Sequence, residues 1–169
     1  MWNDTDIPLG YLITFRCYGT WLHGDERGSV DREHRRYKSP YAMPNSNRRR
    51  HNQGLLKSGP VLLNAQRRAS VEAAIRDTCV RRKWHLHACN VRTNHAHSVV
   101  SIGTKKPDLA LNAFKANATR QMREDGHWQA PHSPWVDRGS KRYLWTERSL
   151  AAAIEYVLYG QGDDPQDFD

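Results

Sequence analysis

Hydrophobic and polar positions along the chain first predict strands. The segments 10–21, 84–91 and 95–102 are rich in β-branched and aromatic residues or alternate apolar with polar positions. Only the residues "RTN" separate the second segment from the third, which predicts a hairpin. A further hairpin is predicted within "SPWVDRGSKRYLW", turning around "RGSK".

Segments at about 64–83, 107–126 and 147–159 show instead the 3.6-residue period of amphipathic helices. Asn64 is suited to cap the first helix, Pro107 to open the second, and "GQG" to end the third. The apolar positions are Val71, Ala74, Ile75, Thr78 and Cys79 on the first helix, and Leu111, Phe114, Ala118 and Met122 on the second. Each helix is therefore expected to bury one face.

The order of these elements predicts the fold class. A strand, a helix, two strands, a helix, two strands and a helix indicate an α+β fold of ferredoxin-like rhythm, with a mostly antiparallel sheet. Residues 1–169 are expected to form a single domain that ends in an acidic tail at 163–169. Residues from about 24 to 62 lack a period and contain "RRYK" and "NRRRH". They predict a long basic loop, which either contacts nucleic acid or is a solvated insertion.

The composition indicates a class of binding partner and a cellular compartment. Lys and Arg number 26 against 18 Asp and Glu, a net charge of +8, which indicates an anionic partner such as nucleic acid or simply a basic soluble surface. Three cysteines without a CxxC motif fit a reducing compartment. No stretch is apolar enough for a membrane span, so we expect a cytoplasmic protein, prokaryotic and associated with the nucleoid when bound to DNA.

Two histidines in "TNHAHSVV" are the first candidates for chemistry. His95 and His97 lie two apart in a predicted strand, so they point to the same face and could share a metal ion. They could equally be polar residues on the wet face of a sheet. A competing set, His85, His87 and Cys89 in "WHLHAC", has the side chains of a zinc site, and the hairpin register that would relate it to His97 is open.

Two tyrosines on the last predicted helix are the second candidates. A helical wheel places them nearly opposite the apolar stripe, as either nucleophiles or surface residues. Tyr159 adjoins the helix end at Gly160, whereas Tyr156 lies a turn deeper, where packing holds it better. Since a nucleophile needs close alignment with the atom that it attacks, Tyr156 is the better candidate nucleophile. The stripe consists of Leu150, Ile154, Val157 and Leu158.

These motifs, in this order, resemble a known family. "ITFRCYGTWLHGDERGSV", "NHAHSVV", "FKANATRQM", "RGSKRYLW" and "AIEYVLYGQG" are similar to the single-tyrosine HUH transposases, the insertion-sequence-200-like and REP-associated tyrosine transposases. The resemblance runs from about Tyr11 to Gly162. It implies an RRM-like sheet of the HUH-endonuclease type. It also implies cleavage and rejoining of single-stranded or hairpin DNA through a covalent 5′-phosphotyrosine on Tyr156, without ATP.

The resemblance further implies a divalent metal, Mg²⁺ or Mn²⁺, held by His95 and His97. A glutamine four residues after the nucleophile often completes such sites, but here that position is Gly160. Gln161 is therefore the expected third ligand, with Asp163 as the alternative. Family members work as monomers or as homodimers, so the resemblance leaves open whether Tyr156 acts in its own chain or in a partner.

DNA contacts are expected from arginines and lysines of the basic loop and of the "FKANATR" helix, although a solvated helix face explains the latter equally well. The candidates are Arg48, Arg49, Arg50, Lys115 and Arg120. The alternative to a transposase of a small mobile element, or a domesticated relative, is an RRM-like module that binds nucleic acid without catalysis. The aromatic signature of RNA-binding RRM domains is not evident in the sequence.

Overall fold

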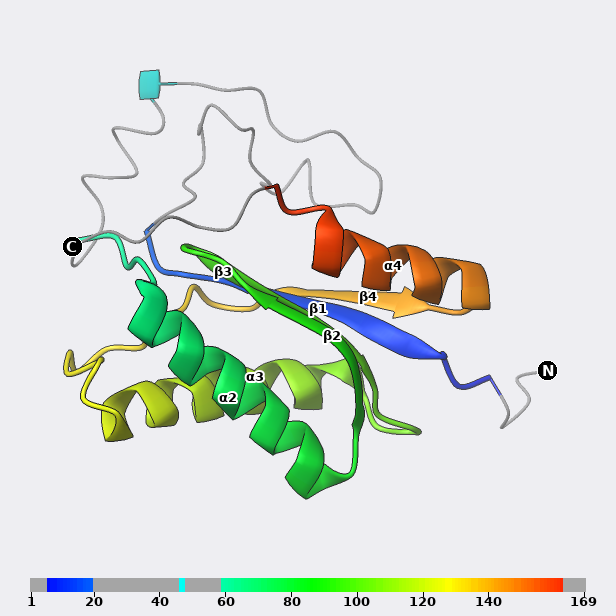
Figure 1. Cartoon of the computed structure of the whole chain (residues 1–169). Coiled ribbons are helices and arrows are strands. Elements are labelled where there is room, and N and C mark those ends of the chain that lie inside the picture. Colours follow the sequence, from blue (N-terminus) through cyan, green and yellow to red (C-terminus); the bar gives the residue numbers. More distant parts are fainter. Residues whose placement is uncertain (1–5, 20–45, 48–58, 163–169) are drawn as a thin grey trace.

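A computed structural model describes residues 6–19, 46–47 and 59–162 of the chain (Figure 1). The predicted helices and the predicted hairpin strands are present within a residue or two of their expected bounds, and Asn64 caps the first helix as expected. The elements are β1 (Gly10–Arg16), α2 (Ala65–Arg82), β2 (His85–Val91), β3 (His95–Ser101), α3 (Pro107–Glu124), β4 (Ser140–Leu144) and α4 (Glu147–Tyr159).

The four strands form one antiparallel sheet in the order β2-β3-β1-β4. This order, with a helix after β1 and another after β3, is that of a ferredoxin-like or RRM-like fold, and the predicted α+β class is confirmed. Figure 1 shows α2 and α3 on one face of the sheet and α4 on the other. The last helix therefore covers the face that a simple ferredoxin-like sheet leaves open.

Alternation along the strands sends side chains to two separate hydrophobic clusters. The larger cluster lies between the sheet and the helices α2 and α3, where Phe15, Ile75 and Phe114 are fully buried. The smaller one lies under α4 and consists of Leu12, Ala88, Val99, Leu144, Ala153 and Val157. Burial of these apolar surfaces is the main force that holds the helices against the sheet.

The hairpin predicted around "RGSK" is wrong. Within the described residues, Trp135 makes an isolated bridge to Cys17, and β4 pairs with β1, so both halves of the expected hairpin add to the same strand. The residues between them bulge outward, with Arg138 in the left-handed region at φ 65°. Lys115 closes the bulge by donating to the carbonyls of Val136 and Arg138, at 2.8 and 2.9 Å. Alternating hydrophobicity cannot distinguish pairing between two segments from pairing of both with a third.

Most of the expected basic loop at 24–62 and all of the acidic tail at 163–169 lie outside the described residues. Where the chain is described again, the backbone N–H of Val61 donates to the carbonyl of Tyr18 at 2.8 Å, and that of Leu63 donates to Thr93 at 2.7 Å. The chain therefore returns beside the end of β1 before it enters α2. None of the described helices is both long and apolar enough to cross a bilayer.

Candidate functional site

The candidate site forms where the C-terminal end of α4 meets the beginning of β3. Ala153 and Val157 bury one side of α4 against the sheet, and the side chain of Asn90 on β2 donates to the carbonyl of Val157 at 2.9 Å. Thr146 begins the helix with a capping box, which satisfies its first backbone N–H groups. Both ends of α4 are thus fixed, and the residues after Val157 are held over the first residues of β3.

His95 and His97 point to this same face, as the strand pattern predicted, with ring centroids 4.6 Å apart. His97 is buried and lies 2.7 Å, through Nδ1, from the hydroxyl oxygen of Thr14 on β1. The Asn94 side-chain oxygen lies 2.6 Å from Nδ1 of His95. Since an amide oxygen only accepts, Nδ1 of His95 donates, and its Nε2 carries the lone pair with which imidazole binds metals.

Gln161 completes the cluster from the end of α4. The side-chain oxygen of Gln161, Oε1, lies 3.4 Å from Nε2 of His95. The side-chain nitrogen of Gln161 donates to the carbonyl of Tyr156 at 3.1 Å, and the Gln161 side chain also forms a hydrogen bond with His97. Two acceptors, an amide oxygen and an imidazole lone pair, therefore face each other. A cation placed between them would satisfy both, because bonds of about 2.1 Å to a shared divalent ion span this separation. The donor set therefore fits a divalent metal.

Within the described part of the chain, no three His, Cys, Asp or Glu side chains lie close enough to hold a metal ion. Among the described residues, a third protein ligand beside the two histidines would therefore be of another type, as Gln161 is. Asp163, the alternative, lies outside the described residues.

Gly160 explains why the amide is five residues after the tyrosine and not four. A Cβ atom at this position would lie 2.8 Å from the carbonyl oxygen of Tyr156 and 3.0 Å from Cδ2 of its ring. Both distances are too short for a side chain to fit unless the tyrosine shifts. The backbone here therefore leaves room for the Tyr156 ring and brings the next residue, Gln161, to the histidines.

Tyr156 and Tyr159 occupy different positions, which the helical wheel did not separate. The apolar stripe is centred on Ala153 and Val157, and Leu158 is exposed, so its assignment to the core is wrong. Tyr156 flanks the stripe with its ring centroid 5.5 Å from that of His97, and 47% of the residue is exposed. Tyr159 points away and is 79% exposed. Only Tyr156 thus joins the histidine cluster.

The electrostatic environment keeps His97 uncharged. Burial lowers its pKa to about 3, helped by repulsion from any proton bound to His95 and from the positive charges of Arg16 and Arg92, while a hydrogen bond with Gln161 acts in the opposite direction. The ring is therefore neutral at physiological pH, the state in which imidazole can bind a metal. Arg16 and Arg92 were missed by the sequence reasoning, and no local pattern indicates them, because the sheet pairing alone brings both beside His97.

The competing zinc set does not form. The hairpin turns through Thr93 and Asn94, which places Cys89 opposite Ser98, on the face away from His97. There the loss of solvent around the sulfur raises the pKa of the Cys89 thiol to about 12. A bulge between Leu86 and Ala88 turns His87 to the other face, where its Nε2 lies 2.7 Å from the hydroxyl of Ser101. The cysteine and the histidines thus point to opposite sides of the sheet.

The predicted DNA-contacting residues lie elsewhere. Lys115 and Arg120 are on α3, beyond the opposite face of the sheet, where Lys115 ties down the bulge before β4 and Arg120 lies 3.9 Å from Glu124. Neither side chain lies near the histidines, so a role in DNA binding stays a prediction for both. The other predicted DNA contacts, Arg48, Arg49 and Arg50, lie outside the described residues.

No protein-family model and no curated protein sequence matches this chain. Among solved structures, it is similar to a REP-associated tyrosine transposase bound to a REP hairpin, at 11% identity and a TM-score of 0.47, over 93% of this chain and 69% of that one. It is also similar to a transposase-like protein of Deinococcus radiodurans, at 15% identity and a TM-score of 0.45, over 93% and 94% of the two chains. At such identities no residue role is transferred, and the site has to be judged by its own geometry.

The lowered pKa of His97 predicts how stability changes with pH. The folded protein keeps this ring neutral down to about pH 3, whereas in the unfolded chain it takes up a proton near pH 6.5. The free energy of unfolding therefore has its full value above about pH 6.5. It declines as the pH falls further, since the unfolded state then binds more protons than the folded state. Between about pH 7 and 5, with chelator present, the melting temperature should fall more for the wild type than for His97→Gln. Equal falls in the two proteins would contradict the assignment.

Proposed function

We propose that this protein is a metal-dependent HUH-type transposase that cleaves and rejoins single-stranded DNA through a covalent tyrosine intermediate. The observation that carries the proposal is the convergence of His95, His97, Gln161 and Tyr156 at one end of the sheet. These residues come from β3 and from the end of α4, more than fifty positions apart in the sequence. If the two histidines were only polar residues on the exposed face of the sheet, nothing would require an amide oxygen and a tyrosine to lie against them.

His95 and His97, with Gln161, would hold the divalent ion, Mg²⁺ or Mn²⁺. When bound, such an ion would withdraw charge from a scissile phosphate and favour its in-line orientation. Asn94 and Thr14 fix the two rings through their Nδ1 atoms, so that the Nε2 atoms serve as ligands. Arg16 and Arg92 add positive charge beside the site, suited to the phosphates on either side of the cleaved one.

Tyr156 would supply the nucleophile. Its phenolic oxygen bonds to phosphorus and loses its proton to solvent, which the half-exposed ring can reach. The bond from phosphorus to the 3′ oxygen of the preceding nucleotide breaks, and that oxygen takes a proton to leave as a 3′-hydroxyl. The 5′ phosphate stays on the tyrosine. Attack by another 3′-hydroxyl then reverses the exchange and joins two strands, and because one phosphoester replaces another at each step, no ATP is needed.

The alternative, an RNA-binding module of the RRM type, is less well supported. Such domains stack bases on aromatic side chains of the sheet face. Here α4 covers that face, and the described strand residues that point to it include histidines, Thr14 and Leu12 but no tryptophan, phenylalanine or tyrosine. Hairpin DNA is the first substrate to test, since a protein to which this chain is similar was solved bound to one.

Replacement of the nucleophile is the direct test. Tyr156→Phe should abolish the covalent protein–DNA adduct on a denaturing gel and retain DNA binding, because only the attacking oxygen is removed. Tyr159→Phe, the matched control on the same helix, should keep most of the adduct, since this ring points to solvent. An adduct that survives in Tyr156→Phe and disappears in Tyr159→Phe would reverse the assignment. An adduct that forms in both variants, or in neither variant nor the wild type, would reject tyrosine catalysis by α4.

Removal of the ligands should separate the metal site from the second histidine pair. His95→Ala and His97→Ala should each abolish cleavage and lower the affinity for Mn²⁺ measured by calorimetry. Gln161→Ala should lower the affinity at least roughly tenfold, because a direct ligand should contribute no less than the outer partners of metal ligands do. His85→Ala and His87→Ala should change neither quantity, because these rings lie farther along the strands. Cleavage that continues in a large excess of chelator would contradict the proposal.

The position of Tyr156 also predicts that each chain acts alone. The tyrosine lies against His97 of its own chain, so its attack should occur in cis. A mixture of Tyr156→Phe with the double variant His95→Ala, His97→Ala should therefore form no adduct, even at high concentration. If the mixture recovers activity in proportion to the content of mixed dimers, the nucleophile acts in trans.

A further inference from the structure

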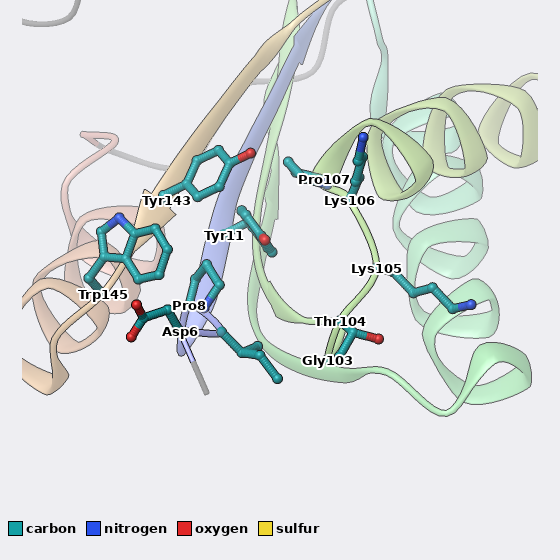
Figure 2. Close-up of a pocket in the computed structure, with 11 residues that line it drawn as sticks. Asp6, Pro8, Tyr11, Gly103, Thr104, Lys105, Lys106, Pro107, Tyr143 and Trp145 are labelled. Atoms are coloured by element: carbon teal, nitrogen blue, oxygen red, sulfur yellow. The ribbon is translucent and has the colours of Figure 1, made fainter. Parts of the chain in front are cut away.

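A second candidate binding surface lies at the opposite end of the sheet. A cavity of about 210 Å³ opens between the start of β1, the end of β4 and the turn from β3 to α3. Since β3 runs from the histidine cluster to this turn, its seven residues put roughly 20 Å between the two. Figure 2 shows the cavity with aromatic side chains on one side and the turn 103–107 on the other.

Two exposed aromatic rings form the first wall. Tyr143 and Trp145 are stacked, with ring centroids 5.8 Å apart and planes inclined by only 25°. The buried Tyr11 meets Tyr143 edge to face at 4.9 Å and holds it from behind. Yet 47% of Tyr143 and 52% of Trp145 stay exposed. Large flat rings kept rigid and exposed are what binding to a planar group requires.

The opposite wall carries positive charge. Lys105 and Lys106 belong to the turn, and Figure 2 shows both side chains extending outward from the cavity. Asp6 is the one carboxylate among the described lining residues, on the aromatic side. Lys141 and Asp108 form an ion pair nearby and cancel each other. The lining of the cavity thus combines aromatic and aliphatic side chains with one carboxylate, and ammonium groups lie outside its rim.

We propose that this cavity holds one unstacked base of single-stranded DNA, outside the catalytic site. The base would stack on Trp145 and Tyr143, and Lys105 and Lys106 would contact the phosphates outside the cavity. Its volume is below that of sites for drug-sized ligands, in keeping with a single ring system. Aromatic rings beside a basic rim are the usual means of binding single strands without sequence preference. The inference deepens the proposed function, because it places a flanking part of the same DNA.

The test measures binding apart from cleavage. A fluorescein-labelled oligothymidylate of about 12 nucleotides is titrated with the protein in chelator, in the background of Tyr156→Phe, and followed by anisotropy. Trp145→Leu should weaken binding roughly tenfold, because stacking on one ring is lost. Trp145→Phe should bind nearly as well as the parent, since it keeps an aromatic face. Melting curves verify that both variants are folded, as expected for a half-exposed side chain.

Two further probes identify what is bound. An oligonucleotide of the same length made of abasic sites keeps the phosphates and lacks the bases, so it should bind weakly and equally to Trp145→Leu and Trp145→Phe. The double variant Lys105→Gln, Lys106→Gln should weaken binding of both probes and flatten the salt dependence. Equal binding of oligothymidylate to the leucine and phenylalanine variants, or displacement of it by a glutamate-rich peptide as readily as by unlabelled oligothymidylate, would overturn the inference.

The outcome is independent of the proposed catalysis. If the wild type forms the tyrosine adduct but Trp145→Leu binds oligothymidylate like Trp145→Phe, only the base-binding cavity is rejected. If binding depends on Trp145 as expected but no adduct ever forms, the cavity stands and the catalytic proposal fails.

Discussion

The packing of α4 across the β2–β3 side of the sheet is the constraint on which the candidate site depends. The helix buries Ala153 and Val157 in a small cluster, with Leu150 and Ile154 partly buried against it, and such non-directional burial alone would tolerate some sliding along the sheet. The bond from Asn90 to the carbonyl of Val157 removes that freedom near the end of the helix. The position of Tyr156, one residue earlier, and of Gln161, four residues later, follows from it.

The site combines neutral ligands with a positive surround. His97 is buried beside Arg16 and Arg92 and would be unstable if charged, and burial lowers its pKa far below its usual range, whereas His95 is only partly buried. Neutral imidazoles and an amide oxygen would leave a cation held by them uncompensated by the protein. Under the proposed function, a phosphodiester would supply the balancing negative charge. The charge pattern is therefore suited to a substrate that brings its own negative charge.

Much of the fold could be predicted from the sequence, because helices with a 3.6-residue period and a short hairpin are locally encoded. The alternation of side chains along a strand, which is also local, placed His95 and His97 on one face of the sheet. The resemblance to transposases pointed to Tyr156 and Gln161. Pairings between distant segments could not be read locally. The false hairpin before β4, the bulge that turns His87 and the approach of Arg16 to His97 each depend on which strand lies beside which. Leu158 was misplaced because a wheel locates an apolar stripe without showing how wide the covering surface is.

The contact between Tyr18 and Val61 has a consequence for how proteins of this architecture can vary. Because a backbone hydrogen bond of 2.8 Å joins Val61 to Tyr18, the two ends of the segment between them lie side by side. The entropy of closing a loop between two such ends rises only with the logarithm of its length, about 0.6 kcal/mol for each doubling. Segments of quite different size and charge can thus be exchanged there with little effect on the sheet. At this junction, selection or an engineer can change the length and charge of the chain while the sheet and the candidate site keep their geometry.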